Sequence, residues 1–137
     1  MYEDVRIITI RQQEYPAVFN TAALEEVTRR YGGLTELGET MKEPAKAIAE
    51  IAWLIALLTA QGAALKKLQE GVEIKTYNAD EIKILMSPKE LMDQSDLVIE
   101  IINAGMGDDG DDADDGAEID EVLEEIEASK NVEGAGA

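Results

Sequence analysis

The sequence predicts a mainly α protein, a small helical domain with a short N-terminal β segment and a flexible acidic C-terminal appendage. Its length of 137 residues suits one domain plus an appendage. Hydrophobic residues make up 45% of the chain but aromatic residues only 4%. The core must therefore be aliphatic, which favours helices packed on helices. The charge is uneven, since residues 107–137 hold 13 acidic side chains and one basic side chain, and the whole chain has a net charge of −18.

The first 20 residues predict the β segment. Residues 5–10 alternate weakly and are rich in β-branched side chains, as strands are. Pro16 then interrupts the chain, and residues 17–19 are expected to form a second extended piece that pairs with the first. Two strands alone are marginally stable, so this pair must lie on helices or against another subunit.

A first amphipathic helix is expected to end at Tyr31. Asn20 or Thr21 suits its N-cap, and Gly32 suits the position just after its end. Its apolar side chains stand at helical spacing: Ala23, Leu24, Val27 and Tyr31.

A short second helix and a long apolar helix follow. Thr35 is expected to cap the short helix, which carries Leu37 and Met41. Pro44 opens the long helix and Gly62 is expected to close it. Apolar side chains surround this helix on nearly all sides: Ile48, Ile51, Ala52, Trp53, Leu54, Ile55, Leu57 and Leu58. Such a helix is either the buried hub of a small domain or a contact between subunits.

The next part of the chain predicts further helices. Residues 63–69 continue as a helical piece that ends at Gly71, and residues 73–77 are extended or a linker. Asn78 is expected to cap a helix over residues 79–86.

The sequence Ser87-Pro88-Lys89-Glu90 then combines an N-cap serine, a proline at the first helical position and a capping-box glutamate. The helix that it opens is expected to run to Ala104, and the glycines at 105 and 107 end it.

These limits divide the chain into four parts. Residues 1–105 form a helical binding domain, 106–117 an acidic flexible linker, 118–130 an amphipathic helix, and 131–137 a disordered tail. Within the third part, four apolar side chains fall at positions i, i+3, i+4 and i+7 of one helical face: Ile119, Val122, Leu123 and Ile126.

The composition excludes several kinds of chemistry. The chain has no Cys and no His, which excludes disulfides, thiolate nucleophiles, structural zinc sites and histidine acid–base catalysis. The aspartates at 108–115 fail the EF-hand spacing in both registers that place a glycine sixth. No glycine-rich phosphate loop is present, and no carboxylate pair is singled out for catalysis. The chain is therefore predicted to be a binding protein, with neither enzymatic activity nor a cofactor or metal.

Charge and hydropathy also bear on partners and location. No basic surface suits a nucleic-acid backbone. The longest apolar run, residues 51–58, is far below the roughly 20 residues that cross a bilayer. The N-terminus has acidic residues ahead of its apolar stretch, the reverse of a secretory signal. We therefore expect no nucleic acid, no membrane and a cytoplasmic location.

The pattern between Val18 and Gly62 resembles the tail assembly chaperones of long-tailed bacteriophages. In that family an extended segment precedes an amphipathic helix, a Tyr/Phe-Gly turn, a short helix and a helix with Trp in an aliphatic block. The first part is matched by Phe19, Asn20, Ala23, Leu24, Val27, Tyr31, Gly32 and Leu34, and the second by Ala47, Ile51, Trp53, Leu54, Leu57 and Leu58. The resemblance covers about residues 5–70, and its motifs are apolar patterns.

The resemblance implies a non-catalytic function. Such chaperones bind the long helical tape measure protein in several copies, keep it soluble and recruit tail tube subunits. They act in the cytoplasm of the host bacterium and are absent from the mature virion. A homo-oligomer is implied as well. An acidic DNA-mimic inhibitor and a general protein-interaction adaptor are the alternatives.

Two sets of residues are the candidates for partner binding or self-association. The first lies on the long helix, in which Trp53, Leu54, Leu57 and Leu58 are expected to serve packing or self-contact. The second is the C-terminal face of Ile119, Val122, Leu123 and Ile126, a helix-in-groove element by its spacing. Whether this face docks on its own core or on a partner is left open by the sequence.

Overall fold

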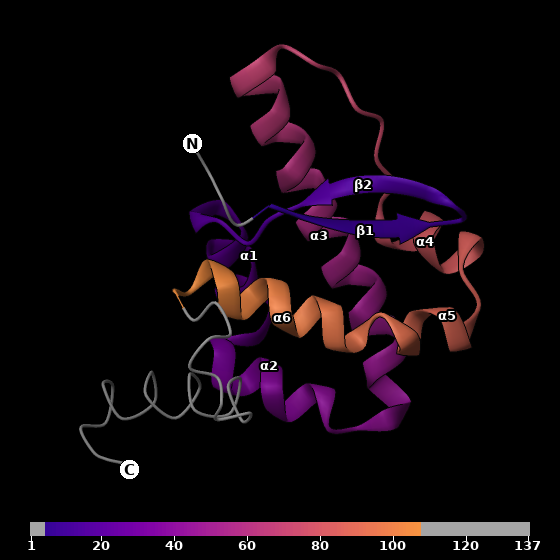
Figure 1. The fold of residues 1–137 in the computed structure, drawn as a ribbon. Coiled ribbons are helices and arrows are strands. Elements are labelled where there is room, and N and C mark those ends of the chain that lie inside the picture. Colours follow the sequence, from indigo (N-terminus) through magenta and orange to yellow (C-terminus); the bar gives the residue numbers. More distant parts are fainter. Residues whose placement is uncertain (1–4, 108–137) are drawn as a thin grey trace.

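The computed structural model describes residues 5–107, and the predicted mainly α class is confirmed. A two-stranded antiparallel sheet precedes the helices (Figure 1). The elements are β1 (Arg6–Ile10), β2 (Gln13–Ala17), α1 (Thr21–Tyr31), α2 (Leu34–Met41), α3 (Pro44–Glu70), α4 (Ala79–Leu85), α5 (Pro88–Asp93) and α6 (Ser95–Gly105).

One strand of the hairpin was predicted correctly, and the other was predicted at the wrong residues. β1 lies where a strand was predicted, but β2 begins at Gln13, so the expectation that residues 17–19 form the second strand was wrong. Arg11 and Gln12 form the two-residue turn, with φ angles of 52° and 72°. Pro16 pairs with Ile7 inside β2. Each strand of a two-stranded sheet has an open edge, where the missing N–H of proline is tolerated.

The caps of α1 were predicted correctly, but the start of α2 was not. The Asn20 side chain accepts a hydrogen bond from the Ala23 N–H, and Gly32 ends α1 in the left-handed conformation at φ 100°. α2 begins directly after Gly33, one residue before Thr35, so Thr35 lies in its first turn and is not its cap.

The long helix continues past the glycine at which it was expected to end. α3 runs from Pro44 to Glu70, and Gly71 ends it at φ 71°. Gly62 is buried within α3, where β2 crosses the helix: a Cβ atom at Gly62 would lie 2.0 Å from the carbonyl oxygen of Pro16. The Val18 N–H donates to the Leu58 carbonyl at 3.2 Å, beside this crossing. The glycine therefore serves close packing of strand on helix and does not break the helix.

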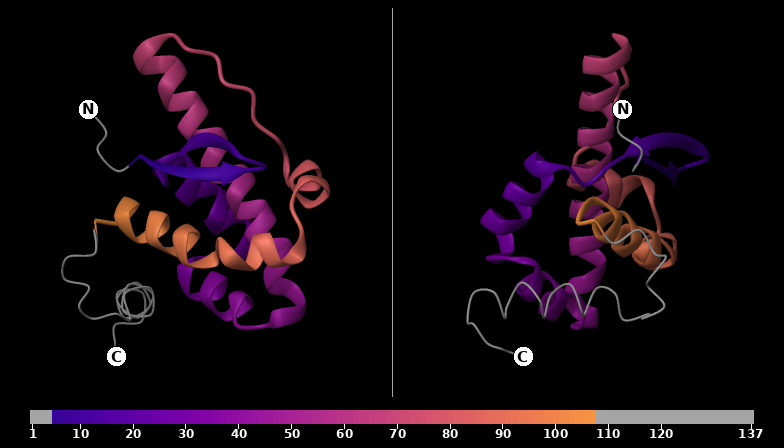
Figure 2. Two further views of the ribbon diagram at one scale, coloured as in Figure 1. Left: turned by 45° about the vertical axis from the view of Figure 1, so that its right-hand side comes forward. Right: turned by 60° about the vertical axis from the view of Figure 1, so that its left-hand side comes forward.

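α3 is the hub of the described fold. It packs against β2 and against each of the other helices. In Figure 2, α1 and α2 lie on one side of it and α4 to α6 on the other. Five of its fully buried side chains belong to the central core: Ile51, Ala52, Leu54, Ile55 and Leu58. The hub interpretation of the apolar helix is thus confirmed.

By length and composition alone, α3 could also cross a membrane. It has 27 residues, and an 18-residue window reaches a mean hydropathy of 1.7, with 39% of that window buried inside the protein. The run of residues 51–58 was shorter because it counted only consecutive apolar side chains and ended before Thr59, whereas the window averages over polar residues as well. A core helix meets the same criteria, and the packing of α3 against its neighbours accounts for its apolar character.

The second half contains two capping boxes and one unexpected break. The pairs Asn78–Glu81 and Ser87–Glu90 each exchange side chain to backbone hydrogen bonds. The Asn78 cap and the Ser87–Glu90 capping box were predicted, whereas the part that Glu81 takes was not. The prediction of a single helix from Pro88 to Ala104 was wrong. It is interrupted at Gln94, whose N–H bonds to the Leu91 carbonyl three residues back and tightens the turn.

The other predicted parts fall partly beyond what is described. α6 ends at Gly105, the predicted limit of the helical domain. The acidic linker at 106–117 is described only at its first two residues, and the predicted helix 118–130 and tail 131–137 lie outside the described residues.

Candidate partner-binding groove

An open groove lies along one side of α3, where the side chains are half-buried or exposed. Its floor is a helical stripe with spacing i, i+3, i+4, i+7 and i+8: Trp53, Ala56, Leu57, Ala60 and Gln61. The neighbouring stripe of the same helix, including Leu54 and Leu58, is buried. α3 is apolar on nearly all sides, so one side fills the core and another remains available to form this floor.

Three other segments form the walls, and the groove encloses about 610 Å³. α1 contributes Glu26, the loop before α4 contributes Thr76, Tyr77 and Asn78, and the first turn of α4 contributes Ala79 and Glu81. The floor is mainly apolar and the rim carries two carboxylates. Glu26 pairs with Arg29 at 2.5 Å, and Glu81 accepts from the Asn78 N–H at 2.9 Å.

Trp53 is held at its end of the groove by contacts with α1. The Tyr31 ring meets it edge-on at 5.7 Å between centroids. The Arg30 guanidinium lies 4.5 Å from the centre of the Trp53 ring, which is cation–π geometry. These contacts leave the indole half-buried and fixed in orientation.

Glu50 organises the two α1 residues that contact Trp53. Arg30 donates to its two carboxylate oxygens at 2.9 and 3.2 Å, and the Tyr31 hydroxyl donates to it as well. Burial acts to raise the pKa of Glu50, but the hydrogen bonds from Arg30 and Tyr31 outweigh it, and the pKa falls below its ordinary value of 4.5. Burial and the neighbouring carboxylate raise the pKa of Tyr31, so its hydroxyl stays protonated and donates.

Tyr77 secures the opposite wall. Its ring meets that of Tyr15 edge-on at 6.2 Å, which ties the loop to β2. Lys75 lies 5.5 Å from the centre of the Tyr77 ring. At the end of the groove near Gln61, the Asn20 side chain donates to the Gln61 side chain at 3.2 Å. The floor is therefore framed by segments that other contacts already hold in place.

The predicted site residues separate into three groups. Trp53 and Leu57 line the groove, whereas Leu54 and Leu58 are buried in the core and serve packing. The C-terminal set of Ile119, Val122, Leu123 and Ile126 lies outside the described residues. Sequence reasoning did not single out Ala56, Ala60 and Tyr77. The two alanines could have been found from their i+3 and i+7 spacing to Trp53, but nothing in the sequence marks the loop residue Tyr77.

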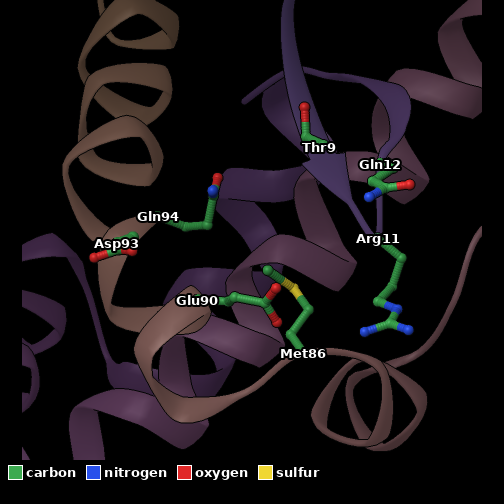
Figure 3. Close-up of a pocket in the computed structure, with 7 residues that line it drawn as sticks. All are labelled: Thr9, Arg11, Gln12, Met86, Glu90, Asp93 and Gln94. Carbon is green, nitrogen blue, oxygen red and sulfur yellow. The ribbon is translucent and has the colours of Figure 1, made fainter.

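A second cavity, of about 400 Å³, is polar (Figure 3). Arg11 and Gln12 come from the hairpin turn, and Glu90, Asp93 and Gln94 from the region of α5. The Gln94 Oε1 atom is buried without a hydrogen-bond partner. Within residues 5–107, no cluster of three or more carboxylates is placed to hold a metal ion. The cavity mixes both signs of charge and lacks the apolar floor of the α3 groove.

Comparison of the chain with protein-family models, curated proteins and solved structures finds no match.

Proposed function

We propose that the protein is a non-catalytic tail assembly chaperone of a long-tailed bacteriophage. In this proposal, several copies bind the tape measure protein in the host cytoplasm, keep it soluble and recruit tail tube subunits, and the mature virion lacks them. The sequence pattern from Val18 to Gly62 supports the family, and the mainly α fold agrees with it.

The observation that carries the proposal is the position of Trp53 and Leu57 on the mainly apolar floor of an open groove whose walls are largely polar. An amphipathic helix binds such a surface by inserting apolar side chains spaced by three and four residues. The carboxylates of Glu26 and Glu81 on the rim favour a client helix whose apolar stripe is flanked by lysine or arginine. Copies arrayed along one long client would gain avidity from individually modest contacts.

The test is an affinity purification from a phage-infected or prophage-induced host, washed at high salt and read by mass spectrometry. Recovery of a very long helical protein with a tail tube subunit would support the proposal. Apolar contacts resist salt, whereas binding through exposed charges is screened. Recovery of only DNA-binding proteins that high salt removes would contradict the proposal and favour a DNA mimic.

A matched pair of variants tests the groove itself. Ala60 and Ala64 are both exposed on α3, one turn apart, but only Ala60 lines the groove. Ala60→Glu places a charge on the floor and should weaken client binding about tenfold or more, a loss of about 1.4 kcal/mol. Ala64→Glu makes the same chemical change outside the groove and should leave binding near the wild-type level. Equal effects of both variants would show that the client binds elsewhere.

A further inference from the structure

The end of α3 projects beyond the hairpin (Figures 1 and 2). We use "α3 spur" for residues 63–75, the part of α3 after Gly62 with the segment that returns towards α4. Leu68 on the spur is 85% exposed and Val72 is 43% exposed. Most of the other large apolar side chains of the described chain are buried or half-buried, so an exposed leucine and valine at one projecting end suggest a surface that something covers.

The tip of the spur has a defined shape. Gly71 ends α3 in the left-handed conformation, and its N–H donates to the Lys67 carbonyl at 2.9 Å. Lys67 also pairs with Glu73 on the return segment at 2.5 Å, and Lys66 pairs with Glu70 at 3.1 Å. Leu68 therefore lies on the last turns of α3, and Val72 lies just after the helix end, on a segment that the Lys67–Glu73 pair joins to the helix.

The charge of the spur is the opposite of that of the chain. The spur carries three lysines and two glutamates, whereas the whole chain has a net charge of −18. Its ion pairs are exposed, and exposed pairs are worth about 0–1 kcal/mol, so the lysines can readily exchange partners. A complementary occupant would combine an apolar stripe with acidic flanks.

We propose that residues 118–127 of the same chain dock on the α3 spur. This segment, Glu-Ile-Asp-Glu-Val-Leu-Glu-Glu-Ile-Glu, consists of four apolar and six acidic residues and has no basic residue. Ile119, Val122, Leu123 and Ile126 are spaced as one helical stripe, so the acidic residues would flank it and meet the spur lysines.

The tether is long enough for this contact. Ten residues, 108–117, separate the described end at Gly107 from the segment. Extended chain spans at most about 3.3–3.6 Å per residue, so the tether reaches about 35 Å. A domain of about 100 residues has a radius of gyration of about 13 Å, and the tether can therefore cross one face of it.

Charge also selects the spur over the Trp53 groove as the docking place. The groove rim carries Glu81 and Glu26, the latter paired with Arg29, and these carboxylates disfavour an acidic segment. On the spur, by contrast, three lysines outnumber two glutamates. The groove is thus left to its client, and the inference does not depend on the proposed chaperone function.

Spin labelling of the full-length chain tests the proposal directly. The protein has no native cysteine, so a single cysteine can be labelled. A nitroxide at Ala64→Cys on the spur should broaden the amide NMR signals of residues 119–126, and a nitroxide at Ile84→Cys on α4 should leave them unchanged. Ile84 is an apt control position because it is 83% exposed.

Two further experiments complete the test: second substitutions in the spin-labelled protein, and mixing of spin-labelled with unlabelled chains. In the Ala64→Cys background, Leu68→Ser or Leu123→Ser should abolish the broadening, whereas Met92→Ser on α5 should not. Failure of the Ala64→Cys label to broaden these signals would overturn the proposal. Broadening of unlabelled ¹⁵N chains mixed with labelled ¹⁴N chains would also overturn it, because the contact would then join two copies. Since no client is present in these samples, the result is independent of the chaperone assay.

Discussion

At the residue scale, Glu50 links the stability of the fold to the shape of the groove. Its carboxylate holds Arg30 and Tyr31, and both of these contact the Trp53 ring. Aromatic pairs and cation–π contacts each add only about 0.5–2 kcal/mol. Their combined effect is geometric, because they fix the indole at one end of the groove floor before any client arrives, which lowers the entropy cost of binding.

We predict that Glu50→Gln flattens the acid dependence of stability. The pKa of Glu50 is lowered by folding, so the ionised carboxylate stabilises the protein above its ordinary pKa of 4.5. That contribution is lost as pH falls through the lower folded value. At pH 7 the variant should lose about 1–3 kcal/mol, the usual cost of weakening hydrogen bonds to a charged group. Urea unfolding between pH 7 and pH 3 measures both effects.

The control for this prediction is Glu39→Gln, which removes a carboxylate at an exposed position of α2. If the unfolding free energies of wild type and Glu50→Gln run parallel across the whole pH range, Glu50 does not contribute in this way.

At the element scale, the crossing of β2 over α3 depends on Gly62. In a helix interior, Gly→Ala ordinarily stabilises by about 0.5–1 kcal/mol. Here an added Cβ would lie 2.0 Å from the Pro16 oxygen and 2.7 Å from the Ala17 nitrogen. Both atoms belong to the backbone, so the strand itself must move. We predict that Gly62→Ala destabilises by about 3 kcal/mol or more, the opposite sign to the propensity effect.

Thermal and urea unfolding of Gly62→Ala measure this, with Gly71→Ala as the matched control. A Cβ at Gly71 meets nothing within 4 Å, and its φ of 71° adds only backbone strain of about 1–2 kcal/mol. A more stable Gly62→Ala variant would contradict the close approach of β2 to α3.

The same crossing shows which features of the fold can be predicted from sequence. Helix starts at Asn20, Asn78 and Ser87 were predictable because a cap is a local hydrogen-bonding pattern carried by neighbouring residues. Gly62 was misinterpreted as a helix end because its role depends on a strand 46 positions earlier in the chain, at Pro16. The break at Gln94 has neither glycine nor proline to signal it.

The groove was predictable only in part for a related reason. Trp53, Leu54, Leu57 and Leu58 are apolar neighbours on one helix, and a helix that is apolar on nearly all sides does not reveal which side faces the core. The packing of the other elements around α3 decides which side is buried: Leu54 and Leu58 are in the core, and Trp53 and Leu57 lie on the groove floor.

At the scale of the whole molecule, α3 satisfies two descriptions, a core hub and a helix with the length and hydropathy of a membrane span. These two descriptions require different arrangements of the elements that pack against α3. A hub needs the apolar faces of α1, α4 and β2 against it. A helix in a bilayer would have to release them, and their buried side chains, including Ala17, Val27 and Ile82, would then be left uncovered.

We therefore predict that the folded chain stays in the lipid-free fraction when it is floated with phosphatidylcholine vesicles. Fully burying one aliphatic side chain is worth about 1.5–3 kcal/mol, and release of α3 would forfeit several such contacts at once. Gly62→Ala is the informative comparison, because loosening β2 from α3 should increase the fraction that floats. Wild-type protein that floats with the vesicles and resists extraction at high salt would contradict the hub description, since the apolar surface of α3 would then be available to lipid.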